Sequence, residues 1–317
     1  MSDGLRLVYC GTPQFAVPSL KALIAAGHTI SLVVSQPDRP VGRKQILTPP
    51  PVKVAALEAG IPVVQPEKIR NNEDFRKQLE EIRPDAIIVV AYGRIIPAWM
   101  LGLPRLGCIN LHGSLLPKYR GAAPIQWSVA MGDTVTGNTT MLLEEGLDTG
   151  PILLQQELPI GPETRADEMF SSLSEAGAPL LLETLKGIAS GTLKPQPQDH
   201  SLATLAPILT REEGLMDFAT RSASDLHNRW RGFQPWPGGF SRIGDKKFIV
   251  HGCKVAPEPV QKPAIPGLLV ARDHRLFVAC AEESWLEITE LQLEGKTRVA
   301  AADFLRGNPL GAGTKLG

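Results

Sequence analysis

The N-terminal part of the sequence alternates short apolar runs with longer amphipathic segments, and this alternation restricts the possible folds more than any other feature. Apolar runs of strand length occupy residues 5–10, 29–35 and 85–92, whereas residues 15–27 and 52–60 have the length and spacing of helices. Uninterrupted apolar runs joined by helices are typical of parallel strands, because both faces of such a sheet are covered. The pattern predicts an α/β domain with a mostly parallel sheet.

The turn after the first apolar run distinguishes this domain from the dinucleotide-binding folds. It reads Gly11-Thr12-Pro13, where those folds carry GxGxxG. A bound pyrophosphate needs close approach of the backbone at several glycines, and only one is present here. We therefore interpret Gly11 as part of a tight strand-to-helix turn, and we expect a Rossmann-like domain without an NAD site.

A proline-rich segment follows the first domain. Residues 191–207 contain three prolines and show little periodicity, which is typical of a linker. A chain of 317 residues has room for two domains, because one domain usually takes roughly 100 to 200 residues. We predict a first domain over residues 1–190, a linker over 191–207 and a second domain over 208–317.

The second domain has a different pattern. Short apolar runs separated by turns occupy residues 238–252 and 267–295, and residues 299–307 have the character of a short helix. Closely spaced short strands are typical of small antiparallel barrels. We therefore predict that residues 208–317 form an OB-like β-barrel.

Composition excludes several kinds of protein. Lys plus Arg total 33 and Asp plus Glu total 33, so a polyanion would be bound by a local basic patch and not by the field of the whole protein. The cysteines form no CxxC pair and the histidines have no zinc-type spacing, so we expect no metal site. No signal peptide is evident, and no run approaches the roughly 18 apolar residues that span a bilayer. We expect a cytoplasmic protein without a membrane partner.

Three polar residues form the candidate catalytic set. Asn110 and His112 are two residues apart on an expected strand, so their side chains point to the same face. Asp148 lies between glycines in a GLDTG turn that can bring its carboxylate to a neighbouring strand. A core histidine and a turn-capping aspartate are the structural alternatives for His112 and Asp148.

Two nucleophilic interpretations are less favoured. Ser114, His112 and Asp148 could form a hydrolase triad, but the serine is not in a G-x-S-x-G setting and the order along the chain is wrong. Cys108 shares the strand face of Asn110, and we interpret it as a small buried hydrophobic residue.

Three motifs together resemble the 10-formyltetrahydrofolate-dependent formyltransferases. They are Asn-Leu-His-Gly-Ser-Leu-Leu-Pro at 110–117, Arg-Gly-Ala-Ala-Pro-Ile at 120–125 and Gly-Leu-Asp-Thr-Gly at 146–150. The resemblance implies that 10-formyltetrahydrofolate is the formyl donor. It also implies that the catalytic residues are Asn110, His112 and Asp148. The folate-binding residues that it implies are Ser114, Leu115, Leu116 and Pro117.

Further motifs resemble the members of this family that act on initiator methionyl-tRNA in translation initiation. They lie at 36–43 in the first domain and at 217–238 in the second. The resemblance implies that the first of these is a loop inserted into the acceptor end of the tRNA. We expect tRNA contacts from basic residues of both domains, namely Arg39, Arg43, Lys44, Arg229, Arg231, Arg242, Lys246 and Lys247. For the second-domain set beside Trp230, a solvated face around a core tryptophan is the structural alternative.

The chemistry of formyl transfer suits the candidate residues. An amine attacks an amide-like carbonyl, so the site must stabilise an oxyanion and remove a proton from nitrogen. The amide of Asn110 can hold the formyl oxygen, the imidazole of His112 can donate to that oxygen or pass a proton, and Asp148 can orient the imidazole.

Other functions stay open at this stage. A formyltransferase acting on an amino sugar nucleotide would share the site, and a 10-formyltetrahydrofolate hydrolase would use water there. A non-catalytic RNA-binding module is the alternative from another class, although such a module has no need of the Asn110, His112 and Asp148 set. We expect a monomer.

Overall fold

The computed structural model describes residues 4–42, 44–311 and 313–317. The chain forms two compact units. The first unit contains the residues up to Pro124 together with Val135–Pro159 and Met169–Pro207. The second unit contains Ile125–Thr134, Ile160–Glu168 and Ile208–Gly317.

A seven-stranded sheet forms the centre of the first unit, with the strand order β10-β9-β7-β6-β1-β2-β5. The five strands from β7 to β5 are parallel, and β9 and β10 are antiparallel to their neighbours. This arrangement confirms the expected Rossmann-like, mostly parallel sheet. The strands are β1 (Arg6–Gly11), β2 (Thr29–Val34), β5 (Val63–Val64), β6 (Ala86–Val90), β7 (Cys108–His112), β9 (Val135–Leu142) and β10 (Ile152–Pro159).

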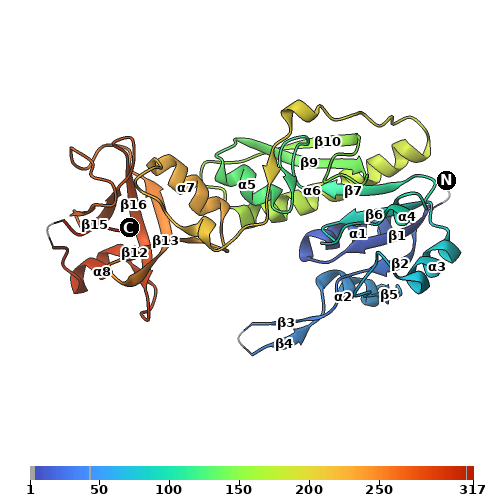
Figure 1. Ribbon diagram of the computed structural model, residues 1–317, viewed down its shortest axis with the longest axis horizontal. Coiled ribbons are helices and arrows are strands. Elements are labelled where there is room, and N and C mark those ends of the chain that lie inside the picture. The colour runs from blue at the N-terminus through green and yellow to red at the C-terminus, as the bar shows by residue number, and fades with distance from the viewer. Residues whose placement is uncertain (1–3, 43, 312) are drawn as a thin grey trace. The chain divides into compact units, whose positions relative to one another are not determined.

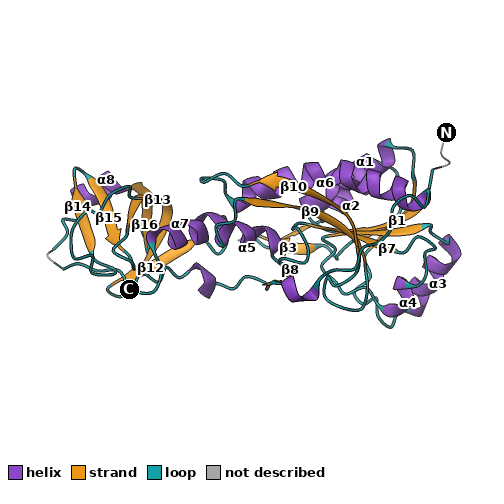
Figure 2. Ribbon diagram, turned by 90° about the horizontal axis from the view of Figure 1, so that it is seen from above, coloured by secondary structure: helices purple, strands orange, loops and turns teal. Residues whose placement is uncertain are grey.

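Helices cover both faces of this sheet. Figure 2 shows α1, α2 and α6 on one face and α3 and α4 on the other. On the second of these faces, Phe75 and Met100 pack with Val8 and Cys10 of β1 in one apolar cluster. The helices are α1 (Val17–Ala25), α2 (Pro51–Glu58), α3 (Glu73–Ile82), α4 (Ala98–Leu101) and α6 (Ala166–Ala189), with the 3-10 turns η1 (Gln14–Ala16) and η2 (His200–Leu202).

Local sequence explains where α3 begins and ends. The side chain of Asn72 caps the helix by accepting a hydrogen bond from the N–H of Phe75 at 3.0 Å. Glu73 and Asp74 place negative charge in the first turn, where the helix dipole favours it. The helix ends at Arg83, which adopts a left-handed conformation with a φ of 49°.

A two-stranded hairpin projects from the first unit (Figure 1). It consists of β3 (Arg39–Val41) and β4 (Ile46–Thr48), which pair antiparallel. At its base, Lys53 forms an ion pair with Asp38 at 2.8 Å and donates to Gln65 at 2.8 Å. These contacts fix the point from which the hairpin leaves the unit.

The segment that the sequence predicted as a linker is hydrogen-bonded to the first unit. The main chain of Gln196 exchanges two hydrogen bonds with Ile152, both at 2.8 Å. Further along, β11 (Leu205–Ala206) pairs in parallel with β8 (Arg120–Gly121). Residues 196–206 therefore lie against β10 and β8, and hydrogen bonds to these strands set the conformation of the segment.

The second unit contains an antiparallel sheet of six strands in the described residues. Its order runs β12-β13-β16-β15-β14, and β17 pairs with β16. The antiparallel arrangement of these strands is confirmed, while closure into a barrel stays a prediction, because no ladder joins β12 to β14 in the described parts. The strands are β12 (Gly239–Ile243), β13 (Lys246–Val255), β14 (Leu269–Arg272), β15 (Arg275–Ala279), β16 (Trp285–Leu293) and β17 (Val299–Ala300).

Helices complete the core of the second unit. They are α5 (Pro124–Ala130), α7 (Ala223–Gly232) and α8 (Ala301–Gly307), with the 3-10 turn η3 (Glu212–Gly214). Leu226 and Trp230 of α7 pack with Phe248 and with Phe304 of α8 in one apolar cluster. Within the described ranges, no helix has both the length and the apolar composition needed to cross a bilayer.

Candidate active site

Strand β7 carries Asn110 and His112 within the sheet of the first unit. Asn110 pairs in register with Met141, and His112 pairs with Thr139, both on β9. The two side chains project from the same face, because successive residues of a strand alternate between faces. His112 is buried and Asn110 is half-buried.

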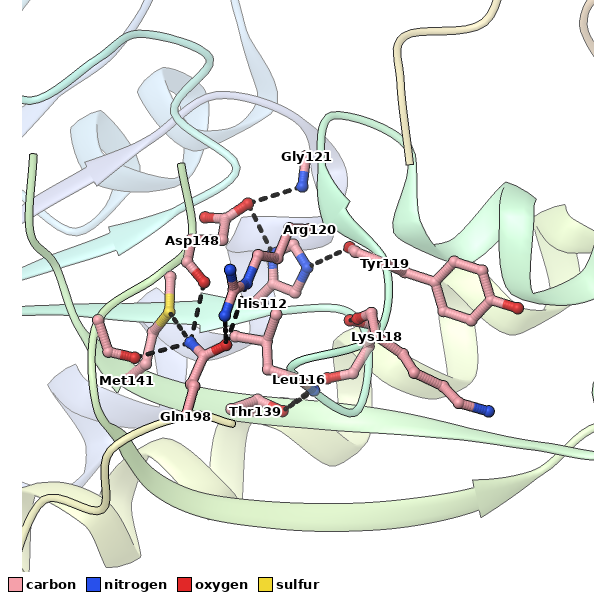
Figure 3. Close-up of polar contacts among 12 residues, drawn as sticks. His112, Leu116, Lys118, Tyr119, Arg120, Gly121, Thr139, Met141, Asp148 and Gln198 are labelled. Carbon is pink, nitrogen blue, oxygen red and sulfur yellow. Dashed lines mark hydrogen bonds and ion pairs between the residues drawn. The ribbon is translucent and has the colours of Figure 1, made fainter. Parts of the chain in front are cut away.

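A main-chain carbonyl orients the imidazole of His112. Its Nε2 lies 2.9 Å from the carbonyl oxygen of Tyr119, as Figure 3 shows. A carbonyl oxygen only accepts hydrogen bonds, so Nε2 carries the hydrogen of this contact. The other ring nitrogen, Nδ1, faces Oδ2 of Asp148 at 3.7 Å.

The turn between β9 and β10 brings Asp148 to this position. Its Oδ2 accepts a hydrogen bond from the N–H of Gly121 at 2.8 Å (Figure 3). Asp148 has a φ of 50°, a left-handed conformation that aspartate adopts more readily than most residues. At Gly150 a Cβ would lie 1.8 Å from the carbonyl oxygen of Leu142, so no other residue fits the end of this turn.

The structure thus brings His112 and Asp148 together and places Asn110 on the same strand face. The Oδ1 atom of Asn110 is buried and has no hydrogen-bond partner within the described ranges. A buried polar atom without a partner is unusual in a folded protein and marks a position where a ligand can complete the hydrogen bonding.

Strand β9 holds the loop of residues 114–117 in place through the side chain of Thr139. The hydroxyl of Thr139 donates to the carbonyl of Ser114 at 2.6 Å and accepts from the N–H of Leu116 at 3.1 Å. The Ser114 hydroxyl itself donates to the carbonyl of Lys118 at 2.7 Å. The loop therefore has a set shape, with Leu115 and Pro117 half-buried and the side chains of Ser114 and Leu116 buried.

The side chain of Gln198 reaches the turn that carries Asp148 and is itself bound by Arg120, and sequence reasoning did not identify either residue as functional. Arg120 donates to Oε1 of Gln198, and Gln198 donates to the carbonyl oxygen of Asp148 at 2.9 Å (Figure 3). Gln198 lies in the segment predicted as a linker, where no local signal marks it. Arg120 belongs to the motif at 120–125, which by itself gives the residue no separate role.

The thiol of Cys108, on the same strand, is buried and donates to the carbonyl of Met100 at 3.4 Å. Burial raises the pKa of this thiol to about 12. At neutral pH it is therefore a thiol and not the reactive thiolate. No group of three or more His, Cys, Asp or Glu side chains is placed to hold a metal ion in the part of the chain that the structure describes.

The basic residues expected to contact tRNA have different environments. In the hairpin of the first unit, Arg39 and Lys44 are exposed, and Arg43 lies outside the described residues. In the second unit, Arg242 and Lys247 are directly opposite each other on β12 and β13. Lys246, next to them, is exposed.

Arg229 and Arg231, both on α7, have partners within the second unit. Arg229 forms an ion pair with Glu213 at 2.6 Å, and its guanidinium lies 4.8 Å from the ring centre of Phe233. Arg231 is 3% exposed and donates to the carbonyls of Gly161 at 3.1 Å and Thr164 at 2.9 Å. The guanidinium of Arg231 is therefore buried and does not face solvent.

Comparison with known proteins identifies the family. The formyl transferase family model matches residues 5–185, and the model of the formyl transferase C-terminal domain matches residues 208–309. The chain is 62% identical to the methionyl-tRNA formyltransferase of Acidobacterium capsulatum, over 99% of this chain and 100% of that protein. The chain belongs to the methionyl-tRNA formyltransferase family. The enzyme of Geobacter sulfurreducens is 46% identical, over 99% of this chain and 97% of its own length.

Solved structures of formyltransferases share the fold. An N-formyltransferase from Helicobacter canadensis, in complex with folinic acid and dTDP-3-aminofucose, has a TM-score of 0.67 at 17% identity, over 90% of this chain and 98% of that one. HypX from Aquifex aeolicus, in complex with tetrahydrofolic acid, has a TM-score of 0.60 at 18% identity, over 96% of this chain and 47% of that one. Family membership agrees with the resemblance that the motifs indicated.

Proposed function

We propose that this methionyl-tRNA formyltransferase family member transfers the formyl group of 10-formyltetrahydrofolate to the α-amino group of methionyl-initiator tRNA. The observation that carries the proposal is the placement of His112 Nδ1 at 3.7 Å from Asp148, on the face of β7 that also carries Asn110. Full-length relatives at 62% and 46% identity support the choice of substrate.

The reaction is a direct transfer. The amine nitrogen attacks the formyl carbon, the carbonyl oxygen becomes an oxyanion, and the bond from the formyl carbon to N10 of the folate then breaks. The amine loses a proton, and N10 of tetrahydrofolate gains one. The site must therefore stabilise an oxyanion and move a proton, without a nucleophile of its own.

Asn110 suits the contact with both reactants. Its amide nitrogen can donate to the oxyanion, while its buried Oδ1, which has no described partner, can accept a hydrogen from the incoming amine. One side chain would then align the amine with the formyl carbon. Holding two reactants in such an alignment lowers the barrier by reducing the entropy lost on the way to the transition state.

His112 and Asp148 suit the proton transfer. Nε2 of His112 is committed to the carbonyl of Tyr119, so Nδ1 is the nitrogen that can exchange a proton. The Asp148 carboxylate faces Nδ1 and stabilises the imidazolium when that nitrogen is protonated. Gly121 holds the carboxylate in place through its N–H.

We infer that the loop of Ser114, Leu115, Leu116 and Pro117 forms part of the folate site. The support for this is the set shape of the loop, which Thr139 maintains directly beside His112 on the neighbouring strand. A preformed loop loses little conformational entropy when a ligand binds.

We infer that tRNA is contacted by the first-unit hairpin, through Arg39, Arg43 and Lys44, and by the second-unit strands. Exposure favours Arg242 and Lys246 as phosphate contacts of the second unit, and register places the half-buried Lys247 directly opposite Arg242. Arg229 is less available because of its ion pair, and the buried Arg231 has a structural role in the second unit. We infer a cytoplasmic location because initiator tRNA takes part in translation. We infer a monomer because all three proposed catalytic residues come from one chain.

A transfer assay tests the proposal. The purified chain is incubated with 10-formyltetrahydrofolate labelled in the formyl group and with one of three acceptors: methionyl-initiator tRNA, an amino sugar nucleotide or water alone. We expect label in formylmethionine after alkaline release from the tRNA. Faster labelling of the sugar, or release of free formate at the same rate without tRNA, would contradict the proposal. His112→Ala is the control for transfer at the described site.

A further inference from the structure

The side chain of Gln198 is a buried connection between two parts of the first unit. It is 6% exposed, although it lies in a segment of mostly exposed residues. Its Nε2 donates to the carbonyl oxygen of Asp148 at 2.9 Å and to that of Gly150 at 2.7 Å. The amide nitrogen thus donates to both carbonyls of the turn that carries the catalytic carboxylate, and it also lies 4.0 Å from Sδ of Met141 (Figure 3).

Arg120 determines which way this amide points. Its Nε and Nη2 donate to Oε1 of Gln198 at 3.1 Å and 2.6 Å, and the guanidinium is itself buried at 7% exposure. A guanidinium can only donate, so it requires the oxygen end of the amide on its side. The nitrogen end of Gln198 must then face the two carbonyls of the turn.

The same region also holds the other end of Asp148. Gly121, the neighbour of Arg120, donates its N–H to the Asp148 carboxylate. The main chain of Arg120 is fixed in turn by its N–H bond to the carbonyl of Thr204 at 2.8 Å, which belongs to the segment of Gln198. The carbonyl and the carboxylate of Asp148 are therefore held by two adjacent residues, one of them acting through Gln198.

We propose that Gln198, oriented by Arg120, is a positioning residue for formyl transfer. It keeps the left-handed turn at Asp148 in the conformation that directs the carboxylate to Nδ1 of His112. This inference rests on the proposed function, because the activity it describes is formyl transfer. Gln198 is buried, and both ends of its amide have partners within the first unit, so we expect its substitution to act on kcat through Asp148 and to leave the binding of donor and tRNA largely unchanged.

Two substitutions of Gln198 test different parts of the proposal. Gln198→Met keeps the size of the side chain and removes every hydrogen bond. Gln198→Glu keeps an oxygen acceptor for Arg120 and replaces the donor to the two carbonyls by a second oxygen. We expect both to lower kcat on the order of tenfold to a hundredfold, with KM for each substrate changed by less than about threefold. Gln196→Met is the matched control, since it makes the same change two residues away on an exposed side chain.

A double-mutant cycle separates positioning from a general loss of structure. In an Asp148→Ala background, Gln198→Met should cost less than about twofold in kcat, because the group it positions is gone. Equal losses in the two backgrounds would overturn the inference, and so would wild-type kcat in Gln198→Glu. If Gln198→Met does not fold, as judged by circular dichroism, the cycle is run with Gln198→Glu. An inactive wild type would instead count against the proposed function.

Discussion

The main-chain carbonyl of Tyr119 accepts a hydrogen bond from Nε2 of His112 at 2.9 Å, and this contact determines which ring nitrogen is free for chemistry. Nδ1 is the nitrogen that faces Asp148. The orientation of the imidazole is thus set by the backbone of the loop that follows β7, while the carboxylate acts on the nitrogen that remains.

Substitutions of His112 that imitate one ring nitrogen at a time should differ in their effect. An asparagine amide reaches the position of Nδ1, whereas a glutamine amide reaches the position of Nε2. We expect both His112→Asn and His112→Gln to lower kcat by at least about a hundredfold, because proton transfer is lost. His112→Asn should keep the higher residual rate, since a donor remains on the side of Asp148. A higher rate in His112→Gln would assign the chemistry to Nε2.

The reaction should proceed without a formyl-enzyme intermediate. The Cys108 thiol is buried, with its pKa raised to about 12 by burial, and the Ser114 hydroxyl donates to the carbonyl of Lys118. Neither group is an activated nucleophile. We expect Cys108→Ala and Ser114→Ala to retain transfer within about tenfold of wild type, because no covalent step depends on them. Mass spectrometry after reaction with labelled donor should find no formyl adduct on either residue, and finding one would refute direct transfer.

Basic residues of the second unit should divide into two groups. Replacing the exposed Arg242 and Lys246 and the half-buried Lys247 by alanine should weaken tRNA binding and make it less sensitive to salt. The slope of log affinity against log salt concentration should fall in magnitude by about one for each side chain that binds a phosphate. Arg231→Ala should instead lower the free energy of unfolding by about 1–3 kcal/mol, because it leaves two carbonyls without their donor. The salt dependence of tRNA affinity in Arg231→Ala should match that of the wild type, as measured by tRNA binding at several salt concentrations. A reduced slope would place Arg231 among the residues that bind phosphate.

Acidification should destabilise the first unit through His28. Burial lowers the pKa of this histidine, and its Nδ1 accepts a hydrogen bond from the N–H of Leu5 at 3.2 Å. The unfolded chain therefore binds the proton more readily, so stability decreases as the pH falls from about 6.5 through the lower pKa of the folded state. His28→Gln should flatten the pH dependence of urea unfolding in this range. The exposed His274, replaced by Asn as a control, should leave the dependence unchanged.

Local pattern was sufficient to predict most of the first unit. Continuous apolar runs indicated β1, β2 and β6, because strands buried on both faces need apolar side chains throughout. The two-residue spacing of Asn110 and His112 indicated a shared strand face. The glycine-flanked turn at 146–150 indicated that Asp148 could reach the same site, and its carboxylate lies 3.7 Å from Nδ1 of His112.

The contacts that sequence reasoning missed join distant residues. Arg120 and Gln198 are 78 positions apart, and no periodicity connects them. The prolines around Gln198 suggested a linker, since proline lacks the N–H that regular structure uses, but main-chain and side-chain bonds to other elements fix this segment. Arg231 was expected on the surface because of its charge. Its guanidinium is nevertheless buried, because carbonyl oxygens accept its hydrogens.

The most direct test of the catalytic account is the coupling between Asn110 and Asp148. Formyl transfer to methionyl-initiator tRNA is measured for Asn110→Ala, Asp148→Ala and the double variant, with kcat/KM compared after equal folding has been verified. If the two residues act with His112 on a single transition state, the double variant should be close to the more impaired single variant. A double variant that loses the full product of the two single factors would show independent contributions and would contradict a single coupled site.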